Sequence, residues 1–296
     1  MSSYVVHGAG AVGGGIGARL HLAGHDVTLV ARGEHLARIR EDGLVLDTAD
    51  GRHTVRVAAT DSAAGVEWRD DTVVVLAVKS HQTEAALADL ARHAPEDVPV
   101  VCAQNGVSNE PATLRRFART YAITAMLPAQ HLEPGLVVQE CHPVPGILDI
   151  GRYPSGTDEV AERISADLRT AGFESVPRPD IMAWKHRKLV TNAVGDVRTV
   201  LPEEGDRLKP LVRAEAEAVL AAAGIPVVSH EDDQERRGDL LQARPGIDGP
   251  NSLGQSLARG LDTEVDFRAG EIVLLGRLHG VPTPANERVQ RAARRK

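Results

Sequence analysis

Cysteine and aromatic residues are scarce in this chain of 296 residues. Its two cysteines, Cys102 and Cys141, are too few for a disulfide scaffold and lack the paired spacing of a zinc site. Eight aromatic residues leave little surface for stacking bases, and the net charge of −7 argues against a general affinity for nucleic acid or anionic membranes. We therefore expect a protein of a reducing, cytoplasmic compartment that binds no nucleic acid.

Long apolar runs are also missing. The most apolar stretch, Thr72–Val78, is far shorter than the roughly 20 residues that span a bilayer. The N-terminal segment has no basic region, and glycines interrupt its apolar stretch where a secretory signal needs continuity. Neither a membrane-spanning helix nor secretion is expected.

Short apolar runs rich in β-branched residues alternate with helix-like segments through the first half of the chain. These runs are Tyr4–Val6, Val27–Val30, Val73–Val78, Val98–Cys102 and Tyr121–Thr124. Alternation of this kind predicts βαβ units and a doubly wound, mostly parallel sheet of the Rossmann type. Gly43–Asp47 and Thr54–Ala58 flank a predicted hairpin turn, and Gly135–Gly151 is typical of an antiparallel edge region.

The pattern changes after Val176, where two prolines interrupt the chain and the helical period takes over. We expect a Rossmann-type domain over residues 1–178 and an all-helical domain over residues 179–296. The predicted helices cover residues 181–196, 202–223, 230–242, 252–259 and 263–278. Gly224 and Gly280, each followed by a proline two residues later, are typical helix ends.

A glycine-rich turn follows the first predicted strand and opens the first helix. The motif GAGAVG supplies the candidate cofactor-binding residues Gly8, Gly10, Ala11, Val12 and Gly13. In a dinucleotide-binding βαβ unit such glycines permit a tight turn, and the pyrophosphate lies on the helix N-terminus. The alternative, an ordinary flexible turn, explains the flanking strand and helix less well.

Arg32 stands at the end of the second strand, where a carboxylate holds the ribose 2′-hydroxyl of NAD in many Rossmann domains. A guanidinium at this place can pair with the 2′-phosphate of NADP through charge-assisted hydrogen bonds. NADPH is therefore favoured over NADH. The alternative is a solvated Arg32 with Glu34 supporting a helix N-terminus.

Lys79 and Asn105 follow the next two predicted strands, at the sheet edge where doubly wound folds bind ligands. The chain has only five lysines against 29 arginines, so lysine is not its default cation. Both residues are candidates for one binding crevice. Taken singly, a surface lysine and a turn asparagine explain them equally well.

One face of the predicted helix over residues 181–196 carries Trp184, Lys188, Asn192 and Asp196 at intervals of four. Partial burial lowers the pKa of a lysine, so Lys188 is a candidate general acid. The competing interpretation is a solvated basic cluster over residues 185–188.

Glu264 and Ser252 are further candidates. A partly buried Lys188 requires an anionic neighbour that orients it and tunes its pKa, and Glu264 is a candidate for that neighbour. In isolation, Glu264 fits an ordinary acid in a first helical turn, and Ser252 an ordinary N-cap.

Taken together, these motifs resemble the ketopantoate reductase family over nearly the full chain. The matching segments are GAGAVG at 8–13, AVKSHQT at 77–83, QNGV at 104–107, WKHRKLVTN at 184–192, NS at 251–252, TEVDF at 263–267 and GEIVLLGRLHGVPTP at 270–284. The resemblance implies NADPH-dependent reduction of a 2-oxo acid to its 2-hydroxy acid, without a metal.

The resemblance also implies roles for single residues. It gives Lys188 as the general acid, Glu264 as its carboxylate, and Asn105 and Asn192 as residues that orient the substrate. It further implies that Ser252 contacts the substrate carboxylate. The cofactor-binding set comprises Gly8, Gly10, Ala11, Val12, Gly13, Arg32, Lys79 and Asn105.

Asp196 departs from the family pattern, because better-known members tend to have a second asparagine there. An anion beside an anionic substrate disfavours binding unless a cation lies close, so we expect a shifted substrate preference.

Two alternative functions remain: an opine-type or imine reductase acting on a C=N bond, and a non-catalytic NADPH-binding sensor. The resemblance assigns NADP binding to residues 1–178 and substrate binding and dimerisation to residues 179–296, so a homodimer is expected.

Overall fold

The computed structural model describes residues 2–247 and 249–296, which form two compact units. Unit 1 contains the residues up to Gln104, Asn109–Ile181 and the segment 237–247. Unit 2 contains Asn105–Ser108, Met182–Arg236 and Gly249–Lys296. The segments 105–108 and 237–247 thus belong to a different unit from the residues on either side of them in the sequence. The division into two domains at residue 178 stays a proposal.

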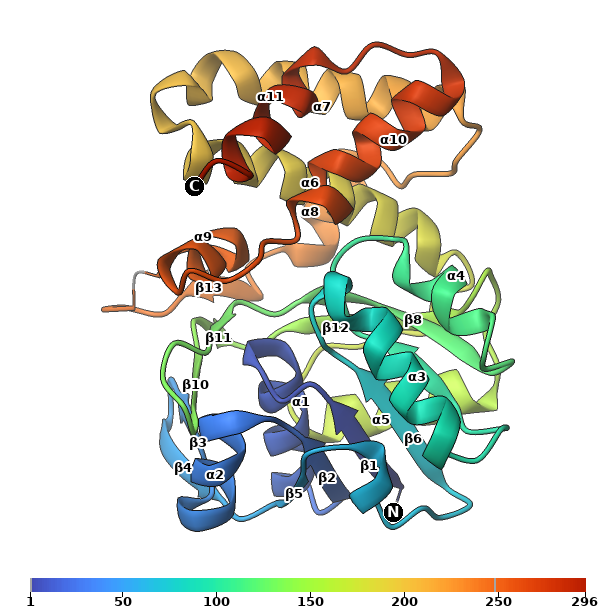
Figure 1. Ribbon diagram of the computed structural model, residues 1–296, viewed down its shortest axis with the longest axis vertical. Helices are drawn as coiled ribbons and strands as arrows, with labels where there is room; N and C mark the ends of the chain where they lie inside the picture. Colours follow the sequence, from blue (N-terminus) through green and yellow to red (C-terminus); the bar gives the residue numbers. More distant parts are fainter. Residues whose placement is uncertain (1, 248) are drawn as a thin grey trace. The chain divides into compact units, whose positions relative to one another are not determined.

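A seven-stranded sheet forms the centre of unit 1 (Figure 1). Its strands, in spatial order, are β12 (Ile147–Arg152), β8 (Thr120–Met126), β7 (Val100–Cys102), β6 (Thr72–Leu76), β1 (Ser3–His7), β2 (Asp26–Val30) and β5 (Ala58–Thr60). All neighbours pair in parallel except β12, which is antiparallel to β8. The predicted mixed α/β fold, with a Rossmann-type sheet followed by a helical part, is confirmed.

The helices of unit 1 cover both faces of this sheet. They are α1 (Ala11–Leu22), α2 (Gly33–Asp42), α3 (Thr83–His93), α4 (Asn109–Leu114) and α5 (Glu159–Thr170). Successive side chains of a strand point to opposite faces, so Tyr4 and Val6 join the core beneath α1 and α5, whereas Val5 joins the core beneath α3. This two-sided burial explains why the three middle residues of β1, Tyr4–Val6, are apolar without alternation.

Two smaller sheets complete unit 1. One has the order β4 (Gly51–Val55), β3 (Leu44–Thr48), β10 (Leu136–Gln139) and β9 (Ala129–Gln130), and the predicted hairpin between β3 and β4 is confirmed. The antiparallel edge region expected over Gly135–Gly151 is only partly confirmed, because β10 pairs in parallel with β3. The second sheet pairs β11 (Cys141–Pro143) with β13 (Leu241–Ala243).

The second half of the chain is mainly helical. Its helices are α6 (Ile181–Val200), α7 (Gly205–Ala222), α8 (His230–Arg237), α9 (Ser252–Ala258), α10 (Ala269–His279) and α11 (Pro284–Ala293). In unit 2, α6, α7, α10 and α11 contribute residues to one apolar core (Figure 1). Among the residues that the structure describes, no helix combines the length and the apolar character that crossing a membrane requires.

Three expectations for this half differ from the structure. The helix expected over residues 263–278 begins only at Ala269, because Val265–Phe267 first form a separate 3-10 turn, η4. The helix expected over residues 230–242 ends at Arg237, because Gly238 has a positive φ of 43° and the following residues pair as β13. Helix α11 is absent from the predictions. Pro282 suggests a stop, but Pro284 then occupies the first turn of a new helix, a position that proline favours.

The packing of the first turn of α1 generates a stability prediction. A Cβ on Gly13 would lie 2.0 Å from the carbonyl oxygen of Gly8, whereas a Cβ on Gly10 would meet nothing within 4 Å. Gly13→Ala should therefore destabilise the fold by about 3 kcal/mol, and Gly10→Ala by no more than about 1 kcal/mol. Urea denaturation of the two variants checks this, and equal losses would contradict the packing described here.

Candidate functional site

The glycine-rich turn joins β1 to α1 in unit 1. Gly8 has φ +107°, and a Cβ there would lie 2.7 Å from the backbone nitrogen of Val78, so this position requires glycine. The open space at Gly10 lies directly before α1, whose first N–H groups have no partner within the helix. This combination of a tight turn, open space and a helix N-terminus suits an anion such as pyrophosphate.

His35 of α2 connects this turn to a distant loop. Its Nδ1 accepts a hydrogen bond from the backbone N–H of Gly135 at 2.8 Å, so its Nε2 carries the proton and donates to the carbonyl oxygen of Ala9 at 2.7 Å. The ring of His131 lies 4.1 Å from that of His35, measured between centroids. These contacts hold the glycine-rich turn from the side of α2, and the sequence analysis did not identify them.

Arg32 lies immediately before α2 and is exposed. Within the described part of the chain, no carboxylate lies at ion-pairing distance from its guanidinium. The nearby His7 is buried at the end of β1, and its Nε2 contacts Asp89 at 3.1 Å. Burial lowers the pKa of His7, the contact with Asp89 opposes this shift, and the positive charge of Arg32 adds to it.

Lys79 follows β6 and lies directly before a short 3-10 helix, η2 (Ser80–Gln82). Around it, a buried polar network links the segments that follow β6 and β7. Gln104 donates to the carbonyl of Val78 at 3.0 Å and to the hydroxyl of Thr83 at 2.7 Å. Thr83 in turn donates to Asn109 at 2.8 Å. These supporting residues were missed, although all lie within a few positions of Lys79 or Asn105.

Asn105 and Asn192 meet in unit 2. The segment Asn105–Ser108 packs there through Val107, which shares an apolar cluster with Leu189 of α6. The Nδ2 of Asn192 donates to the Oδ1 of Asn105 at 3.1 Å. These two candidates, 87 positions apart, are therefore brought together one helical turn from Lys188.

The basic segment over residues 185–188 is not a solvated cluster. Lys185 and Arg187 are buried, and Arg187 donates to Glu217 of α7 and to the carbonyl of Val228, each at 2.8 Å. Lys188 is half-buried on a different face of α6. The interpretation of this segment as a solvated surface is therefore wrong.

Asp196, one turn beyond Asn192, is fully buried and has a cationic partner. The Nη2 of Arg268 lies 2.9 Å from its Oδ1, and the same nitrogen lies 3.4 Å from the backbone carbonyl of Asn192. Arg268 itself is only 4% exposed. Arg268 is thus the cation that compensates the charge of Asp196. No pattern in the sequence indicates this partner.

Glu264 and Ser252 also lie in unit 2. Glu264 is buried immediately before a 3-10 turn, η4 (Val265–Phe267), whereas the neighbouring Asp266 is bonded to Gln290 and Arg294 of α11. The two acids are therefore not equivalent. Ser252 is the first residue of α9, but the side chain that caps this helix is Asn251, which accepts from the N–H of Gly254 at 2.9 Å.

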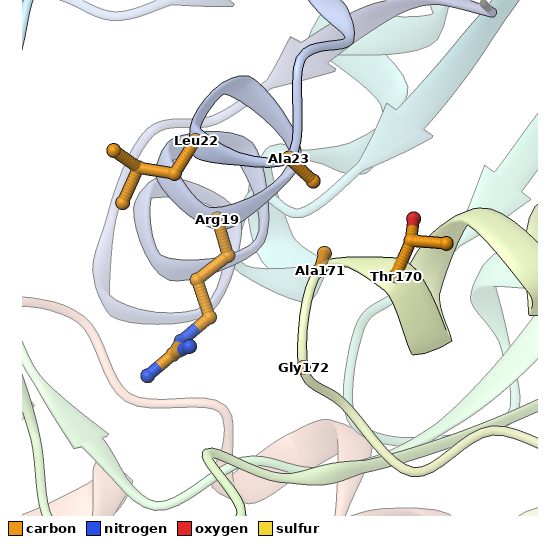
Figure 2. A pocket seen from close by; sticks show the side chains of 6 residues that line it. All are labelled: Arg19, Leu22, Ala23, Thr170, Ala171 and Gly172. Carbon is orange, nitrogen blue, oxygen red and sulfur yellow. The ribbon is translucent and has the colours of Figure 1, made fainter.

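A hollow in unit 1 lies at the opposite end of α1 from the glycine-rich turn. Figure 2 shows it between the ends of α1 and α5, lined by Arg19, Leu22, Ala23, Thr170, Ala171 and Gly172. Helices rise about 1.5 Å per residue, so Leu22 lies roughly 16 Å from the glycine-rich end of α1. Arg19 uses two nitrogens to donate to the side chain of Gln139. The hollow contains none of the candidate residues.

Comparison with known proteins gives one consistent result. A family model described as ketopantoate reductase PanE/ApbA matches residues 4–155, and its C-terminal counterpart matches residues 180–296. A 2-dehydropantoate 2-reductase of Halobacterium salinarum is 30% identical over 95% of this chain and 94% of its own length. One of Pyrococcus horikoshii is 29% identical over 97% of this chain and 94% of its own.

Solved structures agree with this result. A PanE/ApbA family ketopantoate reductase from Ralstonia eutropha is 26% identical, with a TM-score of 0.83 over 99% of this chain and 97% of its own. A D-mandelate dehydrogenase, solved with NADH and anilino(oxo)acetate, has a TM-score of 0.85 over 99% of this chain and 97% of its own at 23% identity, a likeness of fold alone. On these matches, the chain belongs to the ketopantoate reductase family.

Proposed function

We propose that this protein is an NADPH-dependent reductase that transfers a hydride to the ketone of a 2-oxo acid, either ketopantoate or a related compound. Family membership supports a pyridine-nucleotide-dependent 2-oxo acid reductase, an oxidoreductase acting on CH–OH. The hydrogen bond between Asn105 and Asn192, one turn from Lys188, is the observation that carries the proposal. With ketopantoate as substrate, the reaction belongs to pantothenate biosynthesis. A cytoplasmic homodimer remains a prediction.

The glycine-rich turn fits a dinucleotide. The open space at Gly10 admits a ligand close to the backbone, and the first turn of α1 offers N–H donors for its pyrophosphate. Arg32, exposed at the end of β2, supplies a guanidinium for a 2′-phosphate. Lys79 follows β6, the neighbour of β1 in the sheet. These features support NADPH as the cofactor.

Unit 2 supplies the residues for the substrate in this proposal. When bound, the reduced nicotinamide provides the hydride for the ketone carbon. Lys188 gives its proton to the ketone oxygen as negative charge develops there, and buried Glu264 orients the lysine. The Nδ2 of Asn192 has two hydrogens, one of which bonds to Asn105, so the second is left for the substrate. Ser252 binds the substrate carboxylate.

Cofactor preference tests the role of Arg32. NADPH should bind at least about tenfold tighter than NADH, because a charge-assisted hydrogen bond contributes about 1.5–3 kcal/mol. Arg32→Asp should reverse this preference. Arg56→Asp is the matched control, since Arg56 is also exposed in unit 1 and the charge change is the same. Equal dissociation constants for the two cofactors in the unmodified protein, measured by fluorescence titration, would refute the assignment.

Turnover tests the role of Lys188. Lys188→Ala should lower kcat by roughly a hundredfold to ten-thousandfold, the range expected for a positioned general acid, and leave NADPH binding nearly intact. Lys209→Ala, which removes a half-exposed lysine of α7, should change neither quantity. A near-normal kcat in Lys188→Ala would require another proton donor.

A further inference from the structure

Asp196 and Arg268 form a buried ion pair next to a residue proposed to bind the substrate. Asp196 is 0% exposed and Arg268 is 4% exposed, with 2.9 Å between Oδ1 and Nη2. The same guanidinium contacts the backbone carbonyl of Asn192 at 3.4 Å. The pair therefore lies within one helical turn of the Asn105–Asn192 contact.

The charges of this pair bear directly on an anionic substrate. A 2-oxo acid carries a carboxylate, and an uncompensated Asp196 one turn from Asn192 would repel it strongly in a buried setting. Arginine stays protonated at every physiological pH, so Arg268 cancels this charge permanently. If a lysine neutralised Asp196 instead of Arg268, the neighbouring carboxylate would raise the pKa of that lysine. The lysine would then release its proton less readily.

The position of Arg268 in the chain adds to this argument. Arg268 follows Glu264 by four residues, at the entry to α10, so one short segment carries the counter-ion of Asp196 and the proposed partner of Lys188. The Nε of Arg268 is buried and, within the described residues, has no hydrogen-bond partner. Buried donors of this kind are rare, so the guanidinium is held here by its contacts with Asp196 and Asn192 through Nη2.

We propose that Arg268 is a specificity-determining residue, which neutralises Asp196 and so allows an anionic 2-oxo acid to bind beside Asn192. This inference rests on the proposed function. It assigns the neutralising charge to Arg268 and leaves Lys188 as the proton donor. It also means that Asp196 need not exclude ketopantoate, despite its departure from the family pattern.

Steady-state kinetics on a double-mutant cycle test this proposal. Arg268→Met exposes the substrate to the bare charge of Asp196 and should raise KM for the 2-oxo acid at least about tenfold, the effect of a unit charge within about 7 Å at intermediate dielectric. The neutral pair Asp196→Asn with Arg268→Met should recover most of that loss. Arg277→Met, at an exposed arginine of α10, should leave KM and kcat unchanged.

Asp196→Asn keeps the test decisive if Arg268→Met fails to fold. This variant leaves the cation without its partner, so KM for the 2-oxo acid should fall severalfold, whereas a purely structural pair would give no fall in KM. An unchanged or higher KM in folded Asp196→Asn, or a double variant no better than folded Arg268→Met, overturns the inference alone. If the unmodified enzyme reduces no 2-oxo acid, the proposed function fails, and this inference fails with it.

Discussion

The contact between the first turn of α1 and the end of β1 is the constraint on which unit 1 depends. With no side chain at Gly13, the helix approaches so closely that even a Cβ would meet the carbonyl of Gly8. This approach directs the N-terminus of α1 at the carboxyl edge of the central strand. A Cβ on Gly8 would also meet the backbone of Val78, two residues after the neighbouring strand β6, so the turn has little freedom before any ligand binds.

Polar contacts then hold the segments that surround this turn. His35 fixes the Ala9 carbonyl from one side, and the network of Gln104, Thr83 and Asn109 holds the segments after β6 and β7. In unit 2, Arg268 contacts α6 at the backbone carbonyl of Asn192 and at the side-chain carboxylate of Asp196. These contacts restrict the orientation of Asn105, Asn192 and Asp196 and the path of the segments around the glycine-rich turn.

Patterns local in sequence were predictable, and contacts between distant segments were not. The glycine-rich turn and the face of α6 follow from spacing alone, because both lie within one element or one connection. The hydrogen bond between His35 and Gly135 spans 100 positions, and the contact of Arg268 with Asn192 spans 76. Strand β13 has only three residues and exists through its pairing with β11, so no local period indicates it.

Hydride transfer to a 2-oxo acid is the central claim, and isotope transfer tests it most directly. The enzyme would be incubated with ketopantoate and related 2-oxo acids together with NADPH in which both hydrogens at C4 of the nicotinamide are deuterium, and the products analysed by mass spectrometry and NMR. We expect deuterium on the carbon that bears the new hydroxyl group of a 2-hydroxy acid. Deuterium that appears only after an amine is added would indicate reduction of a C=N bond, and the absence of any deuterated product would contradict the account.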